Sequence, residues 1–155
     1  MSEHTAPAHN AQIELRCRID SSMLKPLREF ACGVAQALGF TEQQVNEIEI
    51  CVDEACTNAI EHAYVKTFER DFANNEKDIY IEMTFMGNGL TVRVIDHGCG
   101  AEGGTHPRIR SLEEYIERDQ FRGLGFYLMH KYMDRVTVHT SPGRGTTIEM
   151  TKFRK

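Results

Sequence analysis

Asp53-Glu54-Ala55-Cys56-Thr57-Asn58-Ala59-Ile60-Glu61-His62 is the stretch from which the fold of this chain can be worked out. It forms the second half of a predicted helix that begins at a capping box, Thr41-x-x-Gln44, and fades between Val65 and Phe68. One face of this helix is apolar at helical spacing and should meet the core: Val45, Ile48, Val52, Ala55 and Ala59. A different face carries a second set three or four residues apart: Glu47, Cys51, Glu54, Asn58 and His62.

Most other regular segments alternate between apolar and polar residues, which predicts strands at 12–19, 79–86, 90–96, 135–140 and 146–151. Gly87-Asn88 is a two-residue hairpin turn, and Pro142 to Gly145 turns the last pair. Alternation means that one sheet face is covered and the other is wet. The helices therefore lie on one face of a mixed, mainly antiparallel sheet, which predicts an α+β two-layer sandwich and not a doubly wound sheet.

Three further helices are predicted around this frame. Ser21-Ser22 caps one that Gly39 ends, 111–118 forms a short one, and Gly123 opens another that reaches Met133. Residues 1–11 are small and polar and are predicted to be a disordered tail, with one domain over 12–155. The segment 101–122 exceeds ~15 residues, a length at which a connection in a small domain is usually functional, so we interpret it as a lid loop.

Composition excludes several classes of protein. The net charge of -5 argues against a surface that coats nucleic acid. The five cysteines are odd in number and lack paired spacing, so neither a disulfide framework nor a zinc site is predicted, and free thiols favour a cytoplasmic location. There is no apolar run of about 20 residues and no signal-peptide core, so we expect no membrane association.

Glu54 and Asn58 lie one turn apart on the polar helix face, with His62 next along it. An asparagine oxygen suits Mg²⁺, which also takes water and phosphate ligands. A glutamate there can accept a proton from a hydroxyl that approaches a phosphate. Taken alone, such a pair is more often part of a solvated helix face.

Asp96-x-Gly98-x-Gly100 follows a predicted strand. A carboxylate at a strand end can accept a hydrogen bond from an exocyclic amino group such as that of adenine, and the glycines let the backbone come close to a ligand. By itself the motif is also an ordinary turn.

Gly123-Leu124-Gly125 opens a helix, whose free N–H groups attract phosphate, and Arg122 adds positive charge beside it. It is neither a Walker P-loop nor a Rossmann fingerprint. Thr146, after Gly145, offers a hydroxyl to a base pocket, although a hairpin exit explains it equally well in isolation.

Together and in this order, these four motifs resemble those of the Bergerat-fold (GHKL) ATP-binding family, over nearly the whole chain from Gln12 to Lys152. Glu54-Ala55-Cys56-Thr57-Asn58-Ala59 resembles the N box, and the other three resemble the glycine boxes. Within that family the phrases at 54–64 and 122–129 are most similar to the anti-sigma-factor serine kinases of bacterial partner switching.

The resemblance implies a role for each matching residue. Glu54 would be the general base, Asn58 would hold Mg²⁺, and Asp96 would read adenine with support from Thr146. Arg122 would meet the γ-phosphate of ATP. The remaining predicted nucleotide contacts are His62, Gly98, Gly100, Gly123, Leu124 and Gly125.

The function implied is an ATP-dependent serine-protein kinase that binds a sigma factor and phosphorylates an anti-anti-sigma antagonist, with ATP, ADP and Mg²⁺ as ligands. A homodimer is implied by the resemblance alone. Two alternatives remain open: a nucleotide-dependent binding module without kinase activity, and a structural domain with coincidental motifs.

Overall fold

The computed structural model describes residues 10–18, 20–65, 78–98, 100 and 123–155, with the side chains of 62–65 left out. Its strands are β1 (Ala11–Arg18), β2 (Asp78–Met86), β3 (Gly89–Asp96), β4 (Arg135–Ser141) and β5 (Gly145–Phe153). They form a five-stranded sheet in the order β1-β2-β3-β5-β4, and each neighbouring pair is antiparallel. Ala11, assigned to the tail from sequence, is the first residue of β1.

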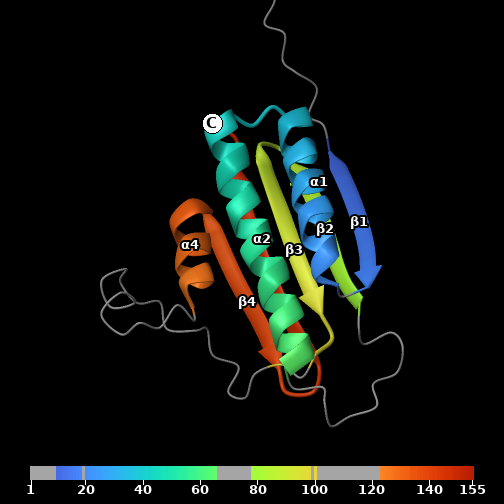
Figure 1. Cartoon of the computed structure of the whole chain (residues 1–155). Helices are drawn as coiled ribbons and strands as arrows, with labels where there is room; N and C mark the ends of the chain where they lie inside the picture. The colour runs from blue at the N-terminus through green and yellow to red at the C-terminus, as the bar shows by residue number, and fades with distance from the viewer. Residues whose placement is uncertain (1–9, 19, 66–77, 99, 101–122) are drawn as a thin grey trace, which may run out of the picture.

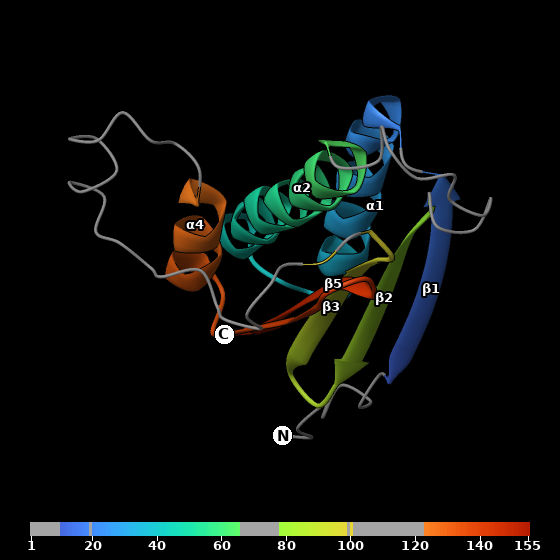
Figure 2. The same ribbon diagram turned by 90° about the horizontal axis from the view of Figure 1, so that it is seen from below.

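All the described helices cover one face of this sheet (Figures 1 and 2). They are α1 (Leu24–Ala37), α2 (Glu42–Val65) and α4 (Leu124–Tyr132), with a 3-10 turn, η1 (Ser21–Met23), before α1. The predicted α+β two-layer sandwich is confirmed. In the described ranges, no helix is long and apolar enough to cross a membrane.

Local signals account for most helix ends. Thr41 and Gln44 make the reciprocal hydrogen bonds of a capping box, with Thr41 N–H to Gln44 Oε1 at 3.2 Å and Gln44 N–H to Thr41 Oγ1 at 3.3 Å. Gly39, at φ +80°, ends α1 in a Schellman motif, because the N–H of Phe40 reaches the carbonyl of Ala35. The predicted Ser21-Ser22 cap is wrong: Asp20 accepts the N–H of Ser22, since a carboxylate one residue earlier reaches that donor.

The core lies between the two layers. All five residues predicted for the apolar face of α2 are at most 4% exposed. They pack with the inward side chains of the central strands, which include Ile81, Met83, Val92, Val94, Ile148 and Met150. The hairpin turn at Gly87-Asn88 is confirmed by the pairing of Met86 with Gly89. The predicted tail apart from its last two residues, the short helix at 111–118 and the lid at 101–122 lie outside the described residues.

Candidate functional site

The direction of α2 decides which of its residues reach the strand ends. At its start, Gln44 Nε2 donates to the carbonyl of Phe153 at 2.8 Å, next to the end of β5. From there α2 runs antiparallel to β5 (Figure 1). Asn58 lies ~20 Å further along the helix axis at 1.5 Å per residue, which brings it to the end of the sheet where β3 stops and β5 begins.

Asp96 is the last residue of β3 and is only 5% exposed. One of its carboxylate oxygens accepts the N–H of Gly98 at 2.9 Å, which fixes its orientation. Thr146 is directly opposite in the register, and its hydroxyl lies 3.1 Å from that of Thr140 on β4. By strand alternation all three side chains point toward the helical layer. A buried acceptor beside two hydroxyls suits a ligand that presents an amino group.

Two glycines allow the neighbouring loops to touch through their backbones. Gly100, at φ +63°, leaves no room for a Cβ, which would strike the carbonyl of Ser141. Gly145, at φ +92°, likewise leaves no room for a Cβ, which would strike the carbonyl of Asp96. Any side chain at either position would push the β3 exit away from the β4–β5 turn. The motif at Asp96 to Gly100 and the motif at Gly145-Thr146 are therefore neighbours in space.

The motif Gly123-Leu124-Gly125 lies against Glu54. Gly123, at φ +94°, precedes the first turn of α4, and its carbonyl accepts the N–H of Tyr127 at 3.2 Å. A Cβ on Gly125 would lie only 2.5 Å from Oε2 of Glu54, so this glycine lets α4 approach α2 closely. Leu124, the first residue of α4, is half-buried. The polar face of α2 is thus not a solvated helix face at this level, because α4 packs on it.

Glu54 has an unusual protonation equilibrium. Burial raises the pKa of its carboxyl above the ordinary value of 4.5, and the charges of Asp53 and Glu61 raise the pKa further. A carboxylate with a raised pKa is a stronger base than an exposed one, and so is better suited to accept a proton near neutral pH.

The surroundings of Asn58 are a separate indication of a ligand site. Its side-chain nitrogen is buried and has no hydrogen-bond partner among the described residues. A buried amide nitrogen without a hydrogen-bond acceptor is costly, and half a turn about the last torsion of the side chain presents oxygen instead of nitrogen at the same place. The residues therefore fit Mg²⁺ with its phosphate ligands, with Asn58 as the protein ligand. His62 belongs to α2, with its side chain outside the described part, and Arg122 lies outside it altogether.

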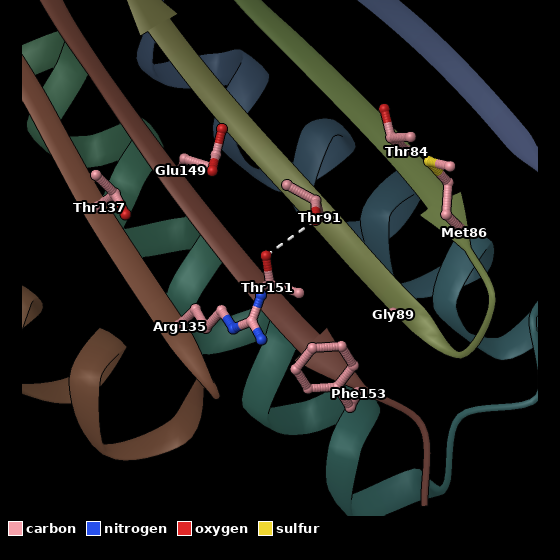
Figure 3. Close-up of a pocket in the computed structure, with 9 residues that line it drawn as sticks. All are labelled: Thr84, Met86, Gly89, Thr91, Arg135, Thr137, Glu149, Thr151 and Phe153. Carbon is pink, nitrogen blue, oxygen red and sulfur yellow. Dashed lines mark hydrogen bonds between the residues drawn. The ribbon is translucent and has the colours of Figure 1, made fainter.

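The hollow in Figure 3 is a different feature. It measures about 280 Å³ and is lined by residues of the open sheet face, among them Thr91, Thr151, Arg135 and Phe153. The helices lie behind the sheet in this view, and none of the predicted site residues lines it. The predicted nucleotide site and this hollow are on opposite faces of the sheet.

Two residues that shape this region, Thr140 and Lys152, were not predicted from the sequence. Thr140 could have been found, because the predicted strands place it across the hairpin from Thr146. Lys152, whose Nζ bonds Glu47 Oε2 and the carbonyl of Tyr132, each at 2.5 Å, had no signal, since a lysine at the end of a strand is ordinarily exposed.

Comparisons with known proteins show the family of the chain. Residues 17–152 match the family described as histidine kinase-like ATPase domain. An anti-sigma F factor from Caldanaerobacter subterraneus subsp. tengcongensis is 30% identical over 145 residues, which are 94% of this chain and 95% of that protein. A serine-protein kinase RsbW from Halalkalibacterium halodurans is 31% identical over 143 residues, 91% of this chain and 82% of that protein.

A solved structure supports the fold independently. The structure of the SiaB-SiaC complex from Pseudomonas aeruginosa contains a chain that aligns with a TM-score of 0.63 over 90% of this chain and 88% of that one, at 10% identity. At that identity the likeness concerns the fold alone. The match over residues 17–152 together with the two relatives establishes that this chain belongs to the histidine kinase-like ATPase domain family.

Proposed function

We propose that the chain is an ATP-dependent serine-protein kinase that binds a sigma factor and phosphorylates an anti-anti-sigma antagonist protein. The observation that carries this proposal is Glu54, a carboxylate of raised pKa held against the first turn of α4. The names of the relatives, anti-sigma F factor and serine-protein kinase, support the two halves of the activity.

Each predicted site residue has a task in this proposal. Asp96 accepts a hydrogen bond from the adenine amino group and Thr146 supports the base, while Gly98 and Gly100 let the backbone approach it. Asn58 holds Mg²⁺, which neutralises phosphate charge when bound. The amides of Gly123, Leu124 and Gly125 face the phosphates at a helix N-terminus, where the macrodipole favours anions. The places of Arg122 at the γ-phosphate and of His62 near the site stay predictions.

Glu54 performs the proton step. The hydroxyl oxygen of the acceptor serine forms a bond to the γ-phosphorus of ATP, and the bond from that phosphorus to the bridging oxygen of ADP breaks. The serine proton passes to the Glu54 carboxylate. Phosphoryl transfer depends chiefly on positioning and charge neutralisation, so a single well-placed base suffices beside the phosphate contacts.

The direct test is transfer of labelled phosphate from ATP to the cognate antagonist protein. Glu54→Gln keeps the shape of the side chain and removes the base, so transfer should fall by roughly 10²–10⁴-fold. Glu42→Gln is the matched control, because Glu42 is exposed on the same helix and its charge is not among those that raise the pKa of Glu54. Unchanged transfer in Glu54→Gln would exclude Glu54 as the base.

A binding module without kinase activity is the second candidate, favoured by the relative named an anti-sigma F factor. It predicts tight binding of Mg-nucleotide and of a partner, with no phosphoserine detected by mass spectrometry in the antagonist. The same labelled-phosphate assay therefore separates the two functions. A cytoplasmic location and a homodimer belong to the main proposal, and light scattering of the purified protein tests the dimer.

A further inference from the structure

Lys152 is a buried cation that joins three elements. It lies on β5 with its side chain 7% exposed and turned toward the helices. Its ammonium group is 2.5 Å from Oε2 of Glu47 on α2 and 2.5 Å from the carbonyl of Tyr132, the last residue of α4. A buried ammonium is retained only where it is paired and hydrogen-bonded, and both conditions are met here.

The two ends of α4 are held on the same face of α2, one by direct contact and the other through Lys152. At one end Gly125 lies against Glu54, and at the other Tyr132 is linked through Lys152 to Glu47. The same number of residues separates Glu47 from Glu54 as separates Gly125 from Tyr132, and the two helices run in opposite directions. Between these contacts, the Cys51 thiol donates to the carbonyl of Leu128 over 3.9 Å.

We propose that Lys152 is a positioning residue that sets the place of α4 along α2, and with it the distance between the phosphate-binding first turn of α4 and Glu54. This inference rests on the proposed nucleotide site. Lys152 touches neither the predicted base pocket nor Glu54, so it acts only through the helix.

The geometry makes α4 suitable for this control. A helix of nine residues is too short to be stable alone, so tertiary contacts decide where it lies. A cation at its C-terminal carbonyl matches the negative end of the helix dipole. Because hydrogen bonds keep the helix stiff along its axis, displacement of Tyr132 carries Gly123 and Gly125 with it. The adenine contacts on β3 and β5 are not attached to α4 and should not move.

The test compares two ligands on the full chain below its melting temperature. In Lys152→Met the affinity for Mg-ADP should fall about tenfold, the effect of misplacing one charge-assisted contact. The affinity for adenosine, which has no phosphate, should stay as in the wild type. Calorimetry measures the first, and competition in NMR titrations measures the second. The double variant Glu47→Gln/Lys152→Met removes both charges, folds without an unpaired buried carboxylate, and should show the same split.

Lys131→Met is the matched control. Lys131 is in the same last turn of α4 and is exposed, so the substitution removes an equal charge without touching the Glu47–Lys152 contact. It should leave both affinities unchanged. Equal losses for Mg-ADP and adenosine in Lys152→Met, or no loss for either, would overturn the positioning role while the nucleotide site stood. A wild-type protein that binds neither ligand would overturn the proposed function itself.

Discussion

Glu47 and Glu54 are the same residue type on the same face of α2, two turns apart, yet their surroundings give them opposite properties. Burial acts to raise the pKa of Glu47, but hydrogen bonds from Lys152 and Gln43 outweigh it, and the pKa lies below 4.5. Glu54 has no ion pair among the described residues, and burial with two acidic neighbours raises its pKa. One carboxylate is held charged by a partner, and the other is held as a stronger base.

This difference separates structural from chemical use of one side chain. A carboxylate in an ion pair stabilises the fold and is a poor proton acceptor, because the pairing lowers its pKa. A partly buried carboxylate without an ion pair costs stability, and groups with such perturbed pKa values cluster at functional sites. Four substitution experiments test whether Glu47 and Glu54 differ in this way.

The largest difference should appear in catalysis. At saturating ATP, Glu54→Gln should lower kcat by roughly 10²–10⁴-fold because the base is gone. Glu47→Gln should lower kcat far less, since Glu47 takes no proton from substrate and acts on the site only through Lys152 and α4. Steady-state kinetics with the antagonist protein measures both. Equal losses of kcat in the two variants would erase the distinction drawn between these glutamates.

A third carboxylate extends the comparison from proton transfer to ligand recognition. Asp96→Asn replaces a charged acceptor in the base pocket, and the affinity for Mg-ADP should fall about tenfold to a hundredfold. The fold should remain intact, because the Asn oxygen still accepts the N–H of Gly98. Calorimetry and circular dichroism together check this outcome. Full affinity in a folded Asp96→Asn protein would show that the adenine of the nucleotide binds elsewhere.

Glu47→Gln should instead lower the free energy of unfolding at neutral pH, by about 2 kcal/mol for a lost charged hydrogen bond, or ~4–8 °C in Tm. The folded pKa of Glu47 lies below the unfolded value, so its stabilising effect is present above about pH 4.5 and is lost as the pH falls through the folded pKa. Thermal melts from pH 7 to pH 3 should therefore converge for variant and wild type. A constant gap across that range would mean that the charge of Glu47 is not what stabilises.

Glu54→Gln should give the smallest effect, and of opposite sign. Its folded pKa is raised, so the wild type has its full stability below pH 4.5 and loses part of it as the pH rises through the folded pKa. The variant should melt at a higher temperature than the wild type at pH 7 and at the same temperature near pH 4. A melting temperature at pH 7 that falls in Glu54→Gln would indicate a stabilising partner for this carboxylate.

Local patterns in the sequence predicted much of the fold. The capping box at Thr41, the turn at Gly87-Asn88 and the apolar face of α2 are each set by residues a few positions apart, and all three are confirmed. The Ser21-Ser22 cap failed because several neighbouring side chains compete for one N–H, and propensity does not rank them. The motifs predicted the site residues, whose roles stay predictions.

Local sequence is enough to predict the alternation of the strands and the two faces of α2, because these depend on the 2.0 and 3.6 residue periods of the backbone. The order of the glycine motifs is read from the sequence directly. Tertiary packing alone brings Gly125 against Glu54, Gly145 against the Asp96 backbone, and Lys152 to both Glu47 and Tyr132. Those contacts join residues far apart in the chain. They exist because the layers pack at one fixed separation, which no local pattern encodes.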